Sequence, residues 1–304
     1  MKRVAAALAA VGVFTGAAAF AQTPPEIADH VRANPPMDSS VGQLYAPMFK
    51  PEPWAGVSVT RDVAYGADPQ QRLDVYAPAA PGKGKRTVIV FVHGGGFVRG
   101  DKHGAFYPDN IPHWAVDHGM VGVSIDYRLA PKDPWPAGAR DLAAAIAWTR
   151  ANIARSGGDP DRIIIWGHSA GANHVADYVA HPEVQGPEAA TVKGAVILSA
   201  FYADTPAGNP ANAYYGSDLK LQSAGDSIAR LERARIPLFV AGADHDPDGF
   251  QAYGAALRAD LCKVGRCPAG LVLKDHNHFS EGMAVGTPDE QLTGPLLSWI
   301  RALR

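Results

Sequence analysis

Short apolar runs alternate with amphipathic stretches along most of this chain. Two early segments, 57–65 and 71–78, alternate apolar and polar residues, as antiparallel strands with one solvated face do. Six later runs are almost continuously apolar and rich in Val and Ile, which is typical of parallel strands buried on both faces. These runs are 87–93, 120–127, 162–167, 194–200, 237–242 and 270–274. The pattern predicts eight strands, two antiparallel ones followed by six in parallel.

Stretches with helical spacing separate these runs. Leu142, Ile146 and Ile153 recur on one helical face, and the Gly157-Gly158 pair predicts the end of that helix. Because strands and helices alternate, we expect right-handed βαβ units in one mostly parallel sheet with helices on both faces. Further helices are predicted directly after residue 169, over 250–264 and over 291–303.

The first 55 residues differ from the rest of the chain. Residues 1–21 begin with two basic residues, continue with an Ala-rich apolar stretch and end in Ala-Phe-Ala, the layout of a secretory signal peptide. We therefore expect cleavage after Ala21 and a periplasmic or secreted protein. Residues 22–55 are Pro-rich without a clean period, and we expect an irregular arm that caps the main domain. Residues 56–304 contain no internal repeat or linker, which predicts one α/β domain.

Composition and charge narrow the classes of partner. Hydrophobic residues make up 47% of the chain and charged residues 19%, as expected for a globular protein with a large core. The formal net charge is -2, and the Lys and Arg residues are scattered, so we expect no nucleic-acid partner. No later apolar run is long enough to cross a bilayer, so we expect no stable membrane insertion. The sequence makes no prediction of the oligomeric state.

The two cysteines, Cys262 and Cys267, lie close together in the segment LCKVGRC. In an oxidising compartment such a pair favours a local disulfide, which would stabilise the fold by roughly 2 kcal/mol. A metal pair or a reactive thiol are the alternatives, although the neighbouring segments supply no further ligands with suitable spacing.

The pentapeptide Gly167-His168-Ser169-Ala170-Gly171 carries the strongest chemical signal. It follows a predicted strand and precedes a predicted helix, where a G-x-S-x-G serine is held on a sharp turn. The helix N-terminus adds free N–H groups near developing negative charge. The bare pattern also occurs in ordinary glycine-rich turns, but this context predicts that Ser169 is a nucleophile.

A second signal is the run His93-Gly94-Gly95-Gly96-Phe97, directly after a predicted strand. Consecutive glycines let the backbone approach a ligand and point N–H groups at an oxyanion, where one donor is worth roughly 3 kcal/mol. A flexible loop or a phosphate cradle is the alternative interpretation. The spacing of a Walker loop or a dinucleotide site is absent. His93 stands at the strand end within the motif, so we expect it to be structural.

Four motifs follow one another along the chain: HGGGF (93–97), DYRLAP (126–131), GGDPDRI (157–163) and GHSAG (167–171). In this order and spacing they resemble the esterase/lipase group of the α/β-hydrolases, in particular its hormone-sensitive-lipase-like and arylformamidase-like carboxylesterases. The resemblance implies backbone donors from Gly95, Gly96 and Ala170, and a bracing role for residues 126–128. His168 stands where the hormone-sensitive-lipase-like branch usually has Asp, which favours the arylformamidase-like branch.

The remaining members of a Ser–acid–His triad should follow in that order along the chain. Asp246 matches the family's Asp-Pro pair after a predicted strand, and Asp244 is the alternative. His278 matches the family's His-Phe-Ser ending, and His276 is the alternative. An imidazole there suits proton transfer at neutral pH. Metal binding by the His-x-His pair has no third clear ligand.

These residues predict a serine hydrolase that cleaves small soluble carboxylic esters, short-chain or aryl, with no cofactor and no metal. Ser169 would form an acyl-enzyme, His278 would transfer the proton, and Asp246 would orient the imidazole. Arylformamide or amide hydrolysis by the same triad is the nearest alternative. A catalytically silent binding module is the alternative from another class. Segments 22–55 and 201–217 are expected to roof the site.

Overall fold

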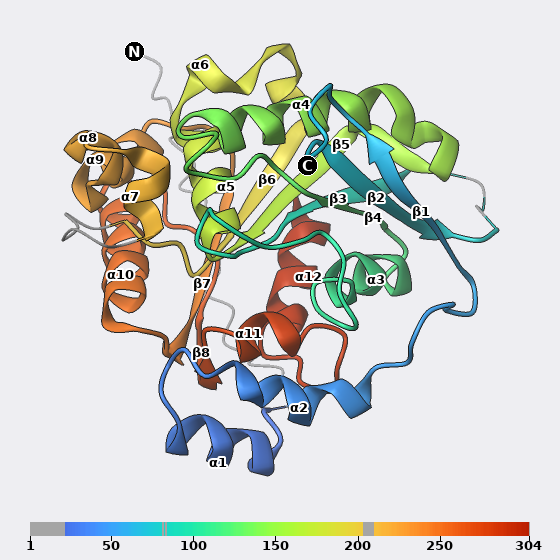
Figure 1. Ribbon diagram of the computed structural model, residues 1–304, viewed down its shortest axis with the longest axis horizontal. Helices are drawn as coiled ribbons and strands as arrows, with labels where there is room; N and C mark the ends of the chain where they lie inside the picture. The colour runs from blue at the N-terminus through green and yellow to red at the C-terminus, as the bar shows by residue number, and fades with distance from the viewer. Residues whose placement is uncertain (1–21, 81, 83, 203–209, 304) are drawn as a thin grey trace, which may run out of the picture.

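A single eight-stranded sheet forms the centre of this computed structural model, which describes residues 22–80, 82, 84–202 and 210–303 (Figure 1). The strands are β1 (Val57–Ala64), β2 (Arg72–Pro78), β3 (Arg86–Val92), β4 (Val121–Ile125), β5 (Gly158–His168), β6 (Val192–Leu198), β7 (Leu238–His245) and β8 (Val272–Asn277). Their order is β1-β2-β4-β3-β5-β6-β7-β8. The predicted eight-stranded α/β sheet is confirmed.

The strand directions confirm the two antiparallel strands followed by six parallel ones. β1 is antiparallel to β2, and β2 is antiparallel to β4, so only β2 runs against the other seven strands. All other neighbouring pairs are parallel. From β3 the chain goes to β4 on one side and later returns to β5 on the other, which makes the end of β3 a topological switch point. Ligand sites of open α/β sheets lie at such a point, outside the carboxyl ends of the strands.

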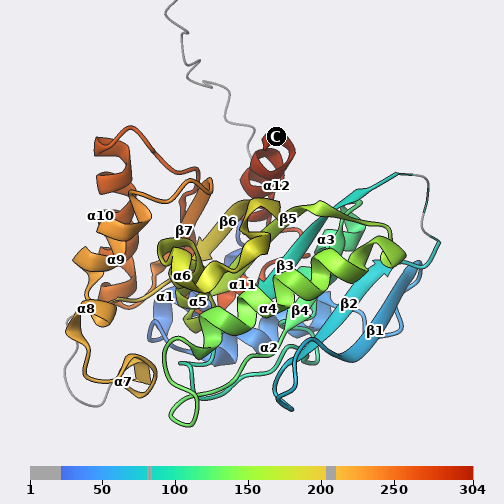
Figure 2. The ribbon, with the colours of Figure 1, turned by 90° about the horizontal axis from the view of Figure 1, so that it is seen from above.

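Helices cover both faces of the sheet (Figure 2). One face packs against α4, α5, α9 and α10, and the opposite face against α3 and α12. The helices predicted around 142–158, after residue 169, over 250–264 and over 291–303 are confirmed as α4, α5, α10 and α12. The bounds of these helices are α3 (Asn110–Asp117), α4 (Ala137–Asn152), α5 (Ala170–Ala180), α9 (Ala224–Leu231), α10 (Asp248–Lys263) and α12 (Thr293–Ala302).

The core explains why the central strands are continuously apolar. Ile163 and Ile165 of β5 point into the cluster with α4 and α5, whereas Ile164 and Trp166 point into the cluster with α3 and α12. All four side chains are fully buried. Successive side chains of a strand face opposite sides, so a strand with helices on both faces needs apolar residues at every position.

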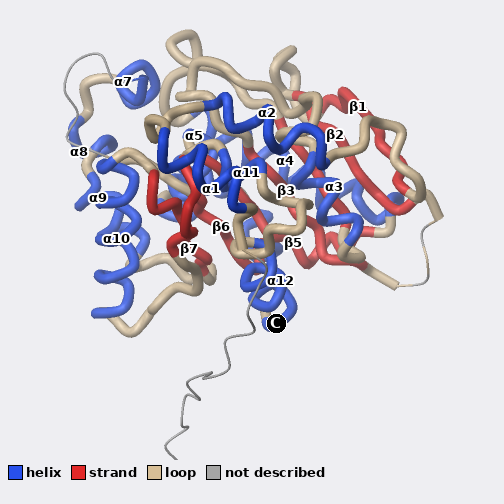
Figure 3. Tube along the Cα trace, turned by 90° about the horizontal axis from the view of Figure 1, so that it is seen from below, coloured by secondary structure: helices blue, strands red, loops and turns tan. Residues whose placement is uncertain are grey.

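Residues 22–55 contain more regular structure than the sequence predicted. The segment forms α1 (Pro25–Ala33), a 3₁₀ turn, α2 (Gly42–Tyr45) and a second 3₁₀ turn. Ile27 and Val31 of α1 pack with Tyr45 and with Met283 near the C-terminal end of the sheet. Figure 1 shows α1 and α2 beside α11 (Ser280–Met283) and β8, and Figure 3 shows α1 and α2 close to α11 from below. The expectation of an irregular arm is wrong here, because these helices are too short for their few buried positions to repeat as a period.

Short helices and a disulfide complete the described structure. Cys262 and Cys267 are joined, which confirms the local bridge at the end of α10. The predicted signal peptide, residues 1–21, lies outside the described residues. Within the described ranges, no helix combines the length and apolar character that a bilayer crossing needs. The remaining short helices are α6 (Pro182–Gln185), α7 (Pro210–Tyr215) and α8 (Leu219–Gln222).

Candidate active site

Ser169 lies on the sharp turn between β5 and α5, as the strand–turn–helix pattern predicts. Its backbone has φ 56° and ψ -127°, a strained conformation for a residue with a side chain. The turn requires glycine beside it, because a Cβ on Gly171 would lie 2.0 Å from the carbonyl oxygen of Val92. The Ser169 N–H donates to the Leu198 carbonyl at 3.0 Å, which ties the turn to β6. Contacts with β3 and β6 therefore hold Ser169 in this strained conformation.

The structure brings Ser169, His278 and Asp246 together in one line of hydrogen bonds. His278 Nε2 lies 2.8 Å from Ser169 Oγ, and His278 Nδ1 lies 2.8 Å from Asp246 Oδ1. Since a carboxylate oxygen only accepts, Nδ1–H donates to Asp246, and Nε2 is free to accept the hydroxyl proton of Ser169. His278 and Asp246 are 1% and 2% exposed, so solvent does not compete for these bonds.

The Asp246 carboxylate is held in place from its other side. Its Oδ2 accepts hydrogen bonds from the Ser199 hydroxyl and from the Ala243 N–H, the latter at 3.2 Å. The alternative acid, Asp244, points elsewhere: its carboxylate lies 3.4 Å from the N–H of His276 and 3.6 Å from Lys274 Nζ. Ser199, which no sequence motif identified, is therefore part of the support of Asp246.

The alternative histidine, His276, is also engaged away from Ser169. Its Nε2 lies 3.0 Å from Asp289 Oδ2, and its Nδ1 lies 3.1 Å from Ser280 Oγ. The predicted strand 270–274 is shifted, because β8 extends to Asn277. His276 is therefore a fully buried strand residue, whereas His278 follows directly after the strand and reaches Ser169.

The glycine loop runs directly against the serine. A Cβ on Gly94 would lie 2.8 Å from the Cβ of Ser169. Gly95 has φ 124°, and a Cβ there would lie 1.9 Å from the Arg99 carbonyl oxygen, so this position admits only glycine. Among the described residues, no group accepts a hydrogen bond from the N–H of Gly95 or Gly96. The N–H of Ala170 belongs to the first turn of α5, where intrahelical partners are lacking.

His93 and the segment 126–128 hold this loop in place. His93 Nδ1 lies 2.6 Å from the Gly94 carbonyl oxygen, and its ring stacks on Tyr127 at 4.6 Å. Arg128 makes charge-assisted hydrogen bonds to the fully buried Asp141, with a shortest distance of 2.7 Å. These contacts agree with the structural role expected of His93 and the bracing role expected of residues 126–128.

A pocket of about 860 Å³ opens above Ser169. Gly95, Gly96, Ala170 and His278 line it together with aromatic side chains. The predicted roof contributes at two points: Met37 from the arm, and Phe201 from the segment 201–217. Residues 203–209 of that segment lie outside the described residues. The aromatic lining comprises Phe97, Tyr107, Phe201, Phe250 and Phe279.

Buried polar contacts fix Phe201 in the pocket wall. Its N–H donates to Asn173 Oδ1 at 3.0 Å, and its carbonyl accepts from Asn173 Nδ2 at 2.7 Å. One turn further along α5, Asp177 accepts hydrogen bonds from Tyr202 and Tyr215 at 2.6 and 2.8 Å. Burial raises the pKa of Asp177 to about 7. Helix α5 thus begins directly after the serine and also carries the anchor of this wall.

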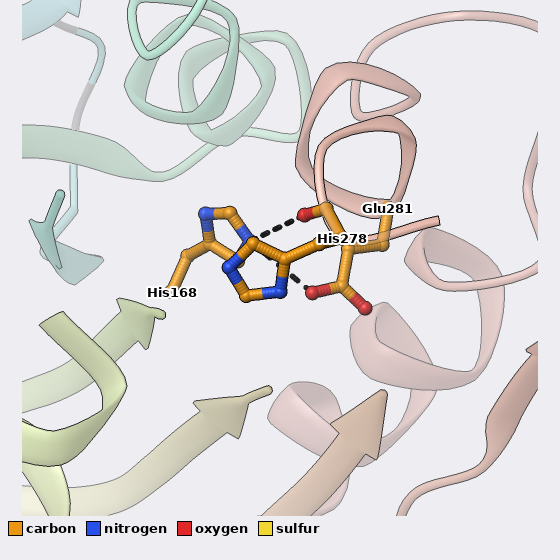
Figure 4. A group of neighbouring side chains, drawn as sticks. All are labelled: His168, His278 and Glu281. Carbon is orange, nitrogen blue, oxygen red and sulfur yellow. Dashed lines mark hydrogen bonds and ion pairs between the residues drawn. The ribbon is translucent and has the colours of Figure 1, made fainter. Parts of the chain in front are cut away.

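A buried group behind His278 was missed by sequence reasoning (Figure 4). His168 Nε2 lies 2.8 Å from the carbonyl oxygen of His278 and 3.2 Å from Glu281 Oε1. His168 Nδ1 lies 2.5 Å from the hydroxyl of Tyr107. Burial lowers the pKa of His168 to about 3, so the ring is neutral. Glu281 carries no sequence signal, since nothing in the local pattern marks a carboxyl group as fully buried.

His168, His278 and Glu281 form the one cluster of described residues with metal-ligand geometry. One ligand atom each from His168, His278 and Glu281 lie within 4.8 Å of one another. Both nitrogens of His278 are already engaged, by Ser169 and Asp246. Nε2 of His168 must carry a hydrogen, because its partner is a carbonyl oxygen. The cluster therefore offers no free pair of imidazole nitrogens and does not fit a metal ion.

Comparison with known proteins places these motifs among esterases. A family model described as BD-FAE matches residues 73–185, which include the glycine loop and Ser169. The chain is 31% identical to esterase LipQ of Mycobacterium tuberculosis over 74% of this chain and 58% of that protein. It is 42% identical to carboxylesterase NlhH of the same organism over 37% of this chain and 34% of that protein. The matched regions thus span less than two thirds of either relative.

Solved structures share the fold over nearly the whole chain. A structure from a study of two fungal esterases from Rhizomucor miehei matches with a TM-score of 0.70 and 22% identity, over 93% of this chain and 98% of that one. The carboxylesterase EstE1, cloned from a metagenomic library, matches with a TM-score of 0.66 and 20% identity, over 93% and 98%. At these identities the likeness concerns the fold.

Proposed function

We propose that this chain is an esterase/lipase-type α/β-hydrolase, and that it hydrolyses carboxylic esters through an acyl-enzyme on Ser169. One observation carries the proposal. Ser169, His278 and Asp246 are linked by two hydrogen bonds of 2.8 Å, and the serine opens into a pocket of about 860 Å³. A weak nucleophile with a base in hydrogen-bond reach, itself oriented by an acid, is the arrangement of nucleophilic acyl transfer.

The proposed reaction proceeds in two acyl-transfer steps. Ser169 Oγ attacks the ester carbonyl while His278 Nε2 takes its proton, and the N–H groups of Gly95, Gly96 and Ala170 receive the oxyanion. The tetrahedral intermediate collapses to the acyl-enzyme, and His278 returns the proton to the departing alcohol. Water then attacks the acyl-enzyme while His278 Nε2 takes its proton, and the second tetrahedral intermediate collapses to the carboxylic acid as His278 returns the proton to Ser169 Oγ. Asp246 stabilises the imidazolium that forms in each step.

The substrates are proposed to be small esters with short-chain or aryl groups. The pocket is lined mainly by apolar and aromatic side chains, including Phe201, Phe250 and Phe279, beside the polar reacting groups. The names of LipQ and NlhH support an esterase activity. No cofactor or metal is part of the proposal. Arylformamide hydrolysis uses the same reacting groups and is tested in the same assay.

Export to the periplasm or the medium is also proposed. The basic, Ala-rich segment 1–21 and the bridge between Cys262 and Cys267 support it. Expression of the full sequence, followed by cell fractionation and mass determination, should give a mature chain beginning at Gln22 outside the cytoplasm. A cytoplasmic protein that retains residues 1–21 would contradict the export proposal.

The activity is tested by labelling and by substrate choice. A fluorophosphonate probe should label the wild-type protein and leave the folded Ser169→Ala variant unlabelled, because the probe needs an activated serine. p-Nitrophenyl esters of increasing chain length should be hydrolysed, with the short acyl chains preferred, beside N-formylkynurenine as the formamide substrate. An unlabelled wild type would favour a silent binding module, and a faster formamide reaction would replace the ester assignment.

A further inference from the structure

A buried carboxyl group that the proposed reaction does not use lies directly behind the histidine. Glu281 is on α11, three positions after His278, and its side chain is fully buried. Figure 4 shows its carboxyl group pointing toward the rings of His168 and His278. We propose that Glu281 is a positioning residue that stays uncharged, so that Asp246 remains the only negative charge beside the imidazole of His278.

The contacts of Glu281 explain how it acts through its neighbours. Its Oε1 lies 3.2 Å from Nε2 of His168, the atom that also donates to the carbonyl oxygen of His278 at 2.8 Å. The neutral ring of His168 then accepts the hydroxyl hydrogen of Tyr107 on Nδ1. Tyr107, His168 and Glu281 thus form a neutral support that ends on the backbone of His278.

Among the residues that the structure describes, no Lys or Arg side chain faces Glu281. The groups that face it are His168 from β5, Tyr107 from the loop before α3, Ser199 after β6, Asp246 after β7, and His278 after β8. Among the described residues, none donates a well-formed hydrogen bond to either carboxyl oxygen. Burial raises the pKa of Glu281 well above its ordinary range, and the charge of Asp246 raises it further, while Ser199 opposes this only in part.

The uncharged state matters for proton transfer. A second negative charge behind His278 would stabilise the imidazolium in the resting enzyme, and an imidazolium cannot accept the proton of Ser169. With Glu281 neutral, the carboxylate of Asp246 alone stabilises the imidazolium, and only when it forms during the reaction. This role rests on the proposed esterase function, whereas the protonation of Glu281 does not.

Protonation of Glu281 predicts a specific pH dependence of stability. An unfolded Glu ionises near pH 4.3, so above that pH the folded chain holds one more proton than the unfolded chain. The folded state then loses stability as pH rises, by up to about tenfold in the unfolding equilibrium constant per pH unit. Gln has nearly the same shape and no ionisable proton, so Glu281→Gln removes this loss.

The first experiment measures urea unfolding of the wild type and Glu281→Gln between pH 5 and 9. The advantage of the variant over the wild type should grow steadily with pH. Glu290→Gln, at an exposed carboxyl group on the surface, is the matched control and should show a constant difference. A difference for Glu281→Gln that stays constant or shrinks with pH would overturn the proposal.

Two further readouts keep the test independent of any single variant. In wild-type protein with carboxyl-¹³C-labelled glutamate, one resonance that Glu281→Gln removes should remain at the protonated position at neutral pH. The acid limb of the kcat/KM profile should lie at the same pH in Glu281→Gln and in the wild type. Glu281→Ala should lose about tenfold or more in kcat, because His278 is then misplaced.

An ionised resonance, or an acid limb displaced to lower pH in Glu281→Gln, would show a charged Glu281. The unfolding and resonance readouts need no esterase activity, so they separate this inference from the proposed function.

Discussion

Replacing Gly96 by alanine tests whether the glycine loop stabilises the transition state. Gly96 has φ 61°, in the left-handed region where a residue with a Cβ costs about 1–2 kcal/mol. Relief of this strain would rotate the peptide plane whose N–H we assign to the oxyanion. Gly96 also lines the pocket above Ser169. The substitution therefore changes a proposed oxyanion donor without removing any core volume.

The two expected effects differ enough in size to be separated. For a domain of this size each kcal/mol lowers Tm by about 2–4 °C, so backbone strain predicts a loss of roughly 2–8 °C. Loss of one oxyanion donor predicts a fall in kcat of about 10²–10³, with KM nearly unchanged. The charge that the donor stabilises develops only in the tetrahedral intermediate, which is why kcat and not KM should respond.

Gly119→Ala is the matched control for backbone strain. Gly119 has φ 78°, is exposed in the turn before β4, and a Cβ there would meet nothing within 4 Å. This variant should lose a similar number of degrees in Tm and keep its kcat. Steady-state kinetics on a p-nitrophenyl ester and a thermal melt of each variant are sufficient. A folded Gly96→Ala enzyme with wild-type kcat would refute the assignment, and the oxyanion donors would have to be sought elsewhere.

Three further results are expected. His278→Ala should lower kcat by several orders of magnitude. His276→Ala should mainly lower Tm, because it breaks the buried contact with Asp289. If His276→Ala instead had the larger effect on kcat, His276 would be the general base. Asp246→Asn should cost about 10⁴ in kcat and Asp244→Asn much less, as measured on the same ester, and equal losses would contradict the geometry. Activity should persist after dialysis against EDTA, and a loss that zinc restores would refute the metal-independent reaction.

Local pattern was sufficient for the architecture of this protein. The continuously apolar runs predicted strands that are covered on both faces. Helical periodicity predicted the helices, and turn residues predicted where they end. The turn at Ser169 could also be predicted, because its glycines are visible in the sequence. The structure shows why one of them is needed: the backbone of Val92 lies too close to Gly171 for a side chain. The pattern failed over 22–55, where helices of one to three turns bury too few side chains to show a period.

The chemistry of the site depended on contacts between residues far apart in the chain. From the sequence, Asp244 and Asp246 were both candidates, as were His276 and His278, and family likeness alone favoured one of each pair. The tertiary structure separates them, since only Asp246 and His278 lie in line with Ser169. The expected strand end at 274 was also too early, because the extension of β8 depends on its pairing with β7.

The buried group behind His278 was beyond sequence reasoning. Glu281 and His168 are 113 positions apart, and Tyr107 comes from a third part of the chain. Their proton states depend on burial and on which charged groups lie nearby, and neither is encoded in the local pattern of residues. The sequence by itself determined which segments become strands and helices and where a serine turn forms. Only the tertiary structure decided which polar groups face one another and which of them are charged, because desolvation and Coulomb interactions depend on distances in the folded state.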